Sequence, residues 1–415
     1  MPTIIPFKAI RPSSDKVHLV ASRSYVTYSA KELKAKLNEN PYSFIHIINP
    51  DYKNKKKVKA NSVEKFKLVR KKYEEFLTDK ILIQEEKPCY YIYRQLKKEI
   101  TYCGLICGIS IDDYINEKIK IHEQTLTKRQ EIFKKYLDIC NFNAEPVLLT
   151  YPDKKEITAI IEANIEAKPE YDFTTTDGTR HSLWIMQNAL DIKNITNHFK
   201  NIPSVYIADG HHRSASSALL GIERRKSDKK YTGKEMYNFL MSFLIPESHL
   251  HIYEFNRLVR DLNGLTEKTF LQKLEKDFTI KNLGAKVSQP QKLHQFSFYL
   301  NKSWYLLKLK KAPILYKKPI NGLDAQILSD KILSPIFDIV DLKTDPRIDF
   351  AGGPNGLQTL IKKVDSGKFA IGFCLYPVSV KQLKSIADAK ETMPPKSTWI
   401  EPKLRSGLTI LNMGE

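Results

Sequence analysis

The densest group of polar residues in the chain is the sequence Asp-Gly-His-His-Arg at 209–213. It directly follows a short apolar run at 204–208 and directly precedes a small-residue segment at 214–220, which predicts a strand, a turn and a helix. A helix that starts after such a turn presents unpaired N–H groups and a partial positive charge at its N-terminus. The spacing therefore favours a binding site for phosphate.

Each residue of this turn has a chemistry that suits such a site. Gly210 permits close backbone approach and a positive φ, and Arg213 supplies a two-pronged donor for phosphate oxygens. His211 and His212 titrate near neutral pH, and Asp209 could hold a Mg²⁺ ion that also touches the phosphates. Two other interpretations stay open: Asp209 caps the helix while one histidine is a core residue, or the histidine pair binds zinc.

A second polar group follows the apolar run at 101–111. Asp112 and Asp113 come first and could ligate a metal, while His122 and Glu123 stand where a helix is expected to begin. A carboxylate beside a histidine can act as general base for a hydroxyl when burial raises its pKa. The alternative is structural, because acidic residues at the start of a helix are favoured by the helix dipole alone.

A third group lies in the tail, where two prolines at 394–395 are followed by Lys396, Ser397 and Thr398, and the group ends near Lys403 and Arg405. A loop stiffened by proline can present these donors to a phosphate or a carboxylate. A solvated loop is the equally open alternative. The chain has no G-x-x-x-x-G-K-[ST] or G-x-S-x-G segment, and its glycine-rich stretch at 351–356 lacks dinucleotide-binding spacing.

Composition narrows the classes of protein that remain. The chain has 415 residues, with 67 basic and 47 acidic side chains and a net charge of +20. This charge fits a polyanionic partner, but it is spread along the chain, which favours a lysine-rich surface or a small phosphate ligand over a nucleic-acid-binding tail. The five cysteines, and the lack of an apolar run of about 18 residues or a signal-like start, predict a cytoplasmic location without a membrane partner.

The elements that must position these groups alternate between helical and strand-like patterns, which predicts a mixed α/β fold. Helices are expected over 61–77, 123–143, 155–167, 188–199, 323–339 and 380–389, strands over 89–94, 101–111, 181–186, 204–208 and 369–376, a hairpin over 293–310, and a basic loop over 222–230. We expect an α/β phosphate-binding domain at 1–245, an α+β domain at 246–345, and a segment at 346–415 that returns to the core.

Several long motifs resemble one bacterial family. They are FKAIRP at 7–12, NPYSFIHI at 40–47, YYIYRQ at 90–95, ISIDDY at 109–114, IKIHEQT at 119–125, YIADGHHRSASS at 206–217 and MPPKSTWIEPKLRSGL at 393–408. Together they run over nearly the whole chain and are similar to the family known as domain of unknown function 1015. Its Asp-Gly-His-His-Arg turn is similar to the phosphate-binding turn of the ParB/sulfiredoxin-like fold, a group that also contains kinases of free serine.

The resemblance implies that Gly210, His211, His212 and Arg213 hold phosphate and that Asp209 sits at the metal or substrate. We therefore expect a phosphotransferase that uses ATP or ADP with Mg²⁺ on a small hydroxyl metabolite, with free L-serine as one acceptor. Glu123 is our choice of base, and no motif assigns it. The alternatives are a ParB-like nucleotide-gated DNA-binding protein, and a phosphoester hydrolase or metabolite sensor with the same phosphate site.

Overall fold

The computed structural model describes residues 1–24, 27–54, 56–311 and 318–414. It divides into two compact units, and each is described by itself. The first unit comprises Met1–Lys120, Gln124–Leu250 and Pro402–Glu415, and the second comprises Ile121–Glu123 and His251–Glu401. The domains expected at 1–245, 246–345 and 346–415 stay a prediction, because compactness does not test whether a segment folds alone.

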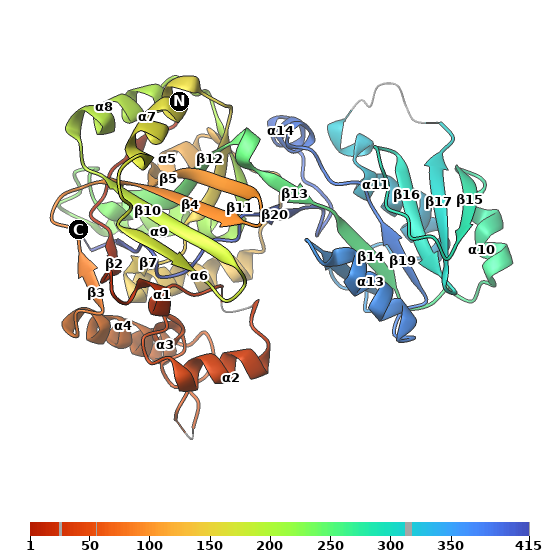
Figure 1. Ribbon diagram of the computed structural model, residues 1–415, viewed down its shortest axis with the longest axis horizontal. Helices are drawn as coiled ribbons and strands as arrows, with labels where there is room; N and C mark the ends of the chain where they lie inside the picture. The colour runs from red at the N-terminus through yellow and green to blue at the C-terminus, as the bar shows by residue number, and fades with distance from the viewer. Residues whose placement is uncertain (25–26, 55, 312–317, 415) are drawn as a thin grey trace. The chain divides into compact units, whose positions relative to one another are not determined.

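The first unit is built on one mixed sheet, so the mixed α/β class is confirmed (Figure 1). Its strands run in the order β6-β11-β8-β12-β5-β4-β10-β9, and β1 pairs with β5. They are β1 (Ile4–Ile5), β4 (Tyr90–Lys97), β5 (Ile100–Ser110), β6 (Ile119–Lys120), β8 (Val147–Tyr151), β9 (Tyr171–Thr174), β10 (Thr179–Met186), β11 (Val205–Asp209) and β12 (Phe239–Pro246). Two small ladders pair β2 (Ile10–Pro12) with β3 (Leu82–Gln84) and β7 (Phe142–Asn143) with β21 (Leu411–Asn412).

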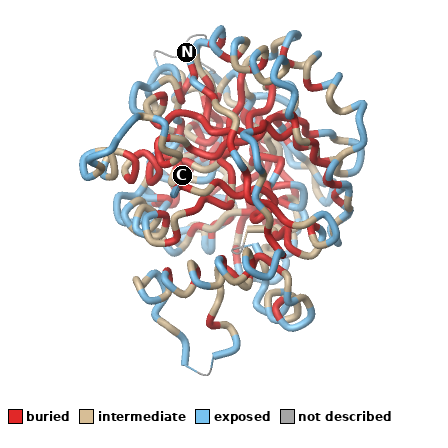
Figure 2. Tube along the Cα trace, turned by 90° about the vertical axis from the view of Figure 1, so that its left-hand side faces the viewer, coloured by how far each residue is buried: buried red, intermediate tan, exposed pale blue. Residues whose placement is uncertain are grey.

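The helices of the first unit follow the apolar periods in the sequence. They are α1 (Val17–Val20), α2 (Ala30–Glu39), α3 (Ile45–Ile48), α4 (Val63–Thr78), α5 (Ile111–Ile115), α6 (Thr127–Cys140), α7 (Lys155–Ile165), α8 (Ala189–Phe199) and α9 (His211–Ser227). Helices α7 and α8 bury isoleucine and phenylalanine side chains in the same core cluster as the sheet. Buried residues gather in the interior and exposed residues lie on the outer helices and loops (Figure 2).

The second unit holds an antiparallel sheet in the order β15-β17-β16-β19-β14-β18. The strands of this sheet are β14 (Phe255–Val259), β15 (Phe278–Gly284), β16 (Gln295–Leu300), β17 (Ser303–Leu309), β18 (Ile348–Gly352) and β19 (Ile371–Cys374). A separate ladder in the same unit pairs β13 (His251–Tyr253) with β20 (Trp399–Glu401). Its helices are α10 (Glu267–Leu274), α11 (Asp324–Leu328), α12 (Ser334–Phe337), α13 (Gly356–Asp365) and α14 (Val380–Asp388). Tight pairing of β16 with β17 confirms the hairpin expected around Asn301 and Lys302.

Three expectations about elements need correction. The basic loop expected over 222–230 is largely helical, because α9 continues to Ser227 and its arginines pair with acidic residues of neighbouring helices. The single helix expected over 323–339 runs without interruption from Asp324 to Phe337, but it is not α-helical throughout, since a π-helical turn at Ser329–Leu333 lies between α11 and α12. The helix expected from 123 begins at Thr127.

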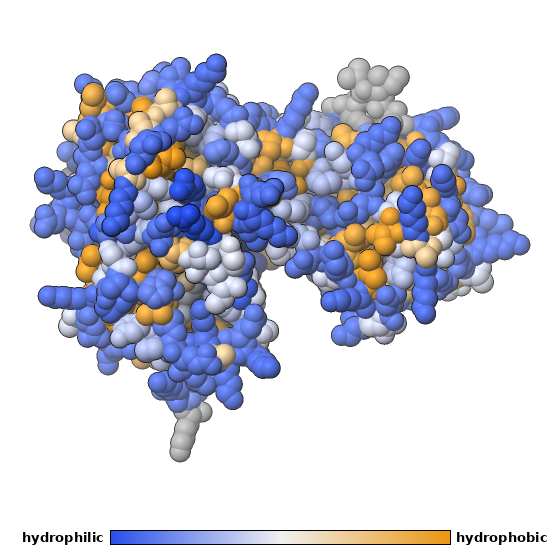
Figure 3. All heavy atoms as spheres, viewed as in Figure 1, coloured by the Kyte–Doolittle hydropathy of each residue, from blue (hydrophilic) through white to orange (hydrophobic). Residues whose placement is uncertain are grey.

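A return segment, residues 402–414, brings the chain back to the first unit after the second unit is complete. Ser406 and Ser22 exchange both of their backbone hydrogen bonds, at 2.8 and 3.1 Å, and the Gly407 amide donates to the Ala144 carbonyl oxygen at 2.9 Å. Within the described ranges no helix is both long and apolar enough to cross a membrane. Hydrophilic residues dominate the face of the molecule in view (Figure 3).

Candidate functional site

The predicted turn lies where β11 ends and α9 begins. Strand β11 is buried up to Ala208, and the last register position pairs Asp209 with Leu148 after a β-bulge. Gly210 then adopts φ 110° and ψ 27°, a conformation that residues with a side chain rarely take. A Cβ at this position would lie 3.1 Å from Val147 and 3.2 Å from two nitrogens of Arg213. Glycine is required here for both its backbone angle and the space it leaves.

Arg213 fills that space with its guanidinium group. Its Nη1 donates to the carbonyl oxygens of Glu145 and Pro146, at 3.1 and 2.7 Å, and lies 3.3 Å from a Glu145 carboxylate oxygen. Its Nε and Nη2 each lie 3.2 Å from the position that a Cβ on Gly210 would take. The side chain is about one-fifth exposed. Arg213 is therefore a cation fixed beside the first turn of a helix, at a depth that solvent still reaches.

Asp209 carries the negative charge of the turn and pairs with Lys403 of the return segment. Lys403 Nζ lies 3.1 Å from Asp209 Oδ2, and each side chain is 44% exposed. Burial opposes ionisation of Asp209, but the charges of Lys403 and Arg213 outweigh it and lower the pKa of this carboxyl. Asp209 is thus ionised at neutral pH and open to a further cation.

The two histidines of the turn differ in their surroundings. His211 is buried at 5% exposure, whereas His212 is partly exposed with its Nδ1 atom sealed and without a hydrogen-bond partner among the described residues. Burial, together with the charge of Arg129, lowers the pKa of His212 below its ordinary value. Because that ordinary value is about 6.5, His212 presents a neutral imidazole at pH 7.

Helix α6 lies beside α9. The Ser216 hydroxyl donates to the Gln130 carbonyl oxygen of α6 at 3.0 Å, and Arg224 pairs with Asp138 at 3.0 Å. The offset between partners is the same in both contacts, so α6 and α9 run parallel with their N-termini together. The strands in front of them, β6 and β11, are also parallel neighbours. Two helix N-termini therefore lie side by side, and that of α9 directly follows the carboxyl end of β11, an arrangement in which anions bind.

The second predicted group is not brought to this turn as one set. Asp112 binds Arg225 at 2.6 Å, and the buried Asp113 accepts from the Thr3 amide at 2.5 Å and pairs with Lys118 at 3.2 Å. Arg225 stands near the far end of α9, about 20 Å along the helix from its start at 1.5 Å per residue. Asp112 and Asp113 therefore fasten elements rather than join Asp209. In the described part of the chain no group of three or more His, Cys, Asp or Glu could hold a metal.

His122 and Glu123, and the loop with Lys396, Ser397 and Thr398, belong to the second unit. The His122 carbonyl oxygen accepts from the Met393 amide at 2.9 Å. The Ser397 hydroxyl donates to the Pro394 carbonyl oxygen at 2.7 Å, which closes the proline loop on itself. Lys396 has φ 57°, and the buried Arg257 donates to its carbonyl oxygen at 2.9 Å. The roles of these residues in catalysis and phosphate binding stay predictions.

Sequence reasoning missed two contacts made by residues of the turn. Glu145, whose backbone holds Arg213, follows a strand of two residues that carries little signal of its own. Lys403 was placed at the end of the tail group, and its contact with Asp209 joins residues 194 positions apart. Neither contact has a local pattern that could have revealed it.

Comparisons with known proteins give a family and distant structural likenesses. No curated protein matches the chain. Among solved structures, a mutant free serine kinase in complex with AMP is 14% identical at a TM-score of 0.39, over 73% of this chain and 91% of that one. SbnI with a C-terminal truncation from Staphylococcus aureus is 14% identical at 0.38, over 73% of this chain and 85% of that one. A conserved hypothetical protein from Pyrococcus furiosus is 13% identical at 0.36, over 72% and 91%.

Similarities this low assign neither a ligand nor an activity to the chain. The family, in contrast, follows from the sequence. The family model described as "Protein of unknown function (DUF1015)" matches residues 4–326. This is more than three-quarters of the chain, and the chain belongs to that family.

Proposed function

We propose that the turn at 209–213 binds the phosphates of ATP or ADP and that the protein transfers a phosphoryl group to a small hydroxyl metabolite. The observation that supports this most is the arrangement around Gly210. Its positive φ brings the fixed guanidinium of Arg213 against the start of α9, where the N-terminus of α6 adds a second dipole. The combination of two helix N-termini with an arginine fork favours a multiply charged phosphate over a single carboxylate.

The donors of the turn have distinct parts in this proposal. The Ser214 amide donates to the Gly210 carbonyl oxygen at 3.0 Å, so the hydrogen-bond ladder of α9 starts there and the amides of His212 and Arg213 are candidates to bind phosphate. Arg213 neutralises negative charge that spreads over the phosphate oxygens during transfer. His212, which is neutral, would donate one further hydrogen bond. His211, buried beneath, would support the turn.

Asp209 suits Mg²⁺ because this ion is held by one or two carboxylates together with the phosphates themselves. Asp209 is ionised and half-exposed beside the proposed phosphate position. The ion would supply positive charge to the phosphate oxygens.

In the transfer, the acceptor hydroxyl oxygen forms a bond to the terminal phosphorus, and the bond to the bridging oxygen of the nucleotide breaks. The hydroxyl proton passes to a base, for which Glu123, with His122 beside it in sequence, stays the candidate. Free L-serine is the first acceptor to test.

The test is an assay of the full chain with Mg²⁺, ATP or ADP and L-serine, with phosphoserine and inorganic phosphate as the two products measured. Arg213→Ala should lower nucleotide affinity by about 10- to 100-fold, the effect of losing a charge-assisted hydrogen-bond pair. Arg180→Ala is the matched control, since Arg180 is half-exposed and pairs with Asp172 on β9. If Arg213→Ala binds nucleotide and forms product like the parent, the assignment of the turn fails. Release of inorganic phosphate without phosphoserine would instead indicate a hydrolase.

A further inference from the structure

We propose that Lys403 is a phosphate-binding residue of this site and that it takes the place of the divalent cation at Asp209 whenever that cation is absent. This inference rests on the proposed function. Lys403 lies outside residues 4–326, the stretch that the family model matches. Lys403 belongs to the return segment, which is part of the first unit although it follows the second unit in the sequence.

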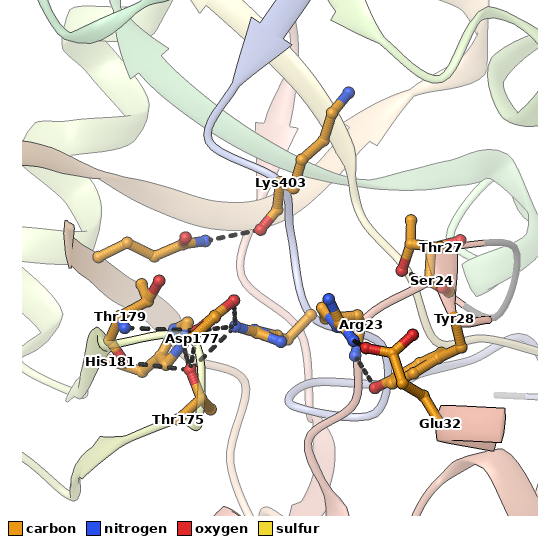
Figure 4. A network of polar contacts seen from close by, with 12 residues as sticks. Arg23, Ser24, Thr27, Tyr28, Glu32, Thr175, Asp177, Thr179, His181 and Lys403 are labelled. Carbon is orange, nitrogen blue, oxygen red and sulfur yellow. Dashed lines mark hydrogen bonds and ion pairs between the residues drawn. The ribbon is translucent and has the colours of Figure 1, made fainter. Parts of the chain in front are cut away.

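The backbone of Lys403 is held in place from both sides. The side-chain amide of Gln95, itself buried, donates to the Lys403 carbonyl oxygen at 3.2 Å. Two residues further on, Arg405 is 7% exposed and donates to both carboxylate oxygens of Asp177, at 3.0 and 2.8 Å. Figure 4 shows the Lys403 carbonyl facing this network while its side chain extends away from it. The backbone from which the Lys403 side chain extends is therefore fixed.

The ammonium group of Lys403, in contrast, lies on a half-exposed side chain. Its pairing with Asp209 joins two side chains that are each 44% exposed, and ion pairs so exposed contribute little to stability. A lysine carries its charge on a flexible four-carbon chain with three donors. Arg213 is the opposite case, because two carbonyl oxygens fix one arm of its guanidinium. The turn thus combines one rigid cation with one adaptable cation.

This adaptability solves an electrostatic problem of the site. Asp209 is an anion, so it repels a phosphate bound at the same turn unless a cation lies between them. With three N–H bonds, Lys403 can donate to Asp209 and to a phosphate oxygen together. A divalent cation bound to Asp209 carries more charge than Lys403 and neutralises both the Asp209 carboxylate and the phosphate. Lys403 then binds only the phosphate. The metal and Lys403 compete for Asp209, while each of them raises the affinity of the site for the nucleotide.

The experiment compares the Kd for ADP, measured by isothermal titration calorimetry in EDTA and in excess Mg²⁺. The quantity of interest is the ratio of the metal-free Kd to the Kd with Mg²⁺. Lys403→Met should raise the metal-free Kd about tenfold and the Kd with Mg²⁺ by less, so the ratio increases. Lys403→Arg, which keeps the charge, should change the ratio less. Asp209→Asn removes the shared ligand and should bring the ratio towards one.

Lys193→Met on α8 is the control, because Lys193 is an exposed lysine of the same unit and its loss should leave both constants unchanged. An unchanged or smaller ratio in Lys403→Met would overturn the inference while leaving the proposed function intact, since the parent would still bind ADP. Equal effects of Lys403→Met and Lys403→Arg would also overturn it, because the charge would then not be responsible. If the parent binds ADP under neither condition, the proposed function itself fails and this inference with it.

Discussion

Arg405 donates from one nitrogen, Nη2, to both carboxylate oxygens of Asp177, at 3.0 and 2.8 Å. The same nitrogen donates to the Thr175 hydroxyl at 2.9 Å. Asp177 and Thr175 stand in the connection between β9 and β10, whereas Arg405 belongs to the return segment. This contact fastens the return segment to the sheet edge, where Figure 4 shows Asp177 and Thr175 close to His181.

Asp177→Asn should destabilise the protein because it leaves the buried Arg405 without an opposite charge. Burial opposes ionisation of Asp177, but the Thr175 hydroxyl and Arg405 outweigh it and hold the pKa of Asp177 well below its usual range. A carboxyl with a lowered pKa stabilises the fold above its unfolded pKa of about 3.9, and that stability is lost as pH falls through the folded pKa. We expect a loss of about 2 kcal/mol at pH 7, and a difference from the parent that shrinks as pH falls below about 4.

Urea unfolding followed by circular dichroism at pH 7 and pH 3 measures this effect. Asp172→Asn is the matched control, because Asp172 pairs with Arg180 at the surface. Its substitution should lower the free energy of unfolding by less than about 1 kcal/mol. Equal losses in the two variants would contradict the role assigned to Asp177.

His181 should stay neutral far below the pH at which an exposed histidine gains its charge. Its Nδ1 lies 2.7 Å from the Tyr93 hydroxyl and its Nε2 lies 3.1 Å from the Thr175 hydroxyl, with no exposed surface. Burial, and next the charge of Arg405, lower the pKa of His181 to about 3. The unfolded chain takes up this proton near pH 6.5, so the free energy of unfolding should fall as pH drops from about 6.5 towards 3, by at most about 1.4 kcal/mol per pH unit.

Chemical denaturation between pH 7 and pH 4 measures that slope, and His181→Gln should reduce it. Nitrogen chemical shifts of the imidazole provide an independent measurement in the folded protein. A His181 signal that titrates near pH 6.5 in the native state would rule out the sealed arrangement.

Gly210→Ala should weaken nucleotide binding more than it weakens the fold. A Cβ at φ 110° is strained, by about 1–2 kcal/mol, and it would displace Arg213, whose nitrogens lie 3.2 Å from that position. We therefore expect ADP affinity to fall at least about tenfold. Gly264→Ala separates the two effects, because Gly264 has φ 74° and no atom lies within 4 Å of the position that a Cβ would take there. Comparable ADP binding by the two variants would count against the turn.

Gly221→Ala should destabilise α9 although alanine is the better helix former by about 1 kcal/mol. The added methyl would lie 2.1 Å from the Ile111 side chain and 2.9 Å from the Tyr237 carbonyl oxygen. Overpacking of this kind costs about 1–3 kcal/mol, so the melting temperature should fall. Ile111→Val relieves one of the two contacts and should restore part of the loss. A rise in melting temperature in Gly221→Ala would show that α5 and α9 are not packed this closely.

The sequence predicted those parts of the fold that have a local signal. The apolar spacing at 61–77 marks α4, whose buried residues are Phe66, Val69, Tyr73 and Phe76. The turn at 209–213 was recognisable because a glycine follows a buried apolar run and precedes a helix. Each of these two signals lies within one short, continuous stretch of the sequence.

Contacts that join distant segments left no such signal. The Asp112 carboxylate looked free to bind a metal, and its partner Arg225 stands 113 positions later on a helix whose end was expected to be a loop. The pairing of α6 with α9, which places two helix N-termini together, and the pairing of β6 with β11 both join segments that are far apart in the sequence. Sheet order is a tertiary property, and propensities along the chain do not encode it.

The return segment has a consequence for how the protein is made. Gln95 and Lys403 are hydrogen-bonded across 308 positions of chain, so the whole second unit must emerge from the ribosome before this contact can form. Contacts between residues so far apart in sequence close slowly during folding. A nascent chain that has not yet presented Lys403 therefore has Gly210 and Arg213 but lacks the ammonium group that pairs with Asp209. Under the proposed function, its affinity for nucleotide should rise once residue 403 has emerged.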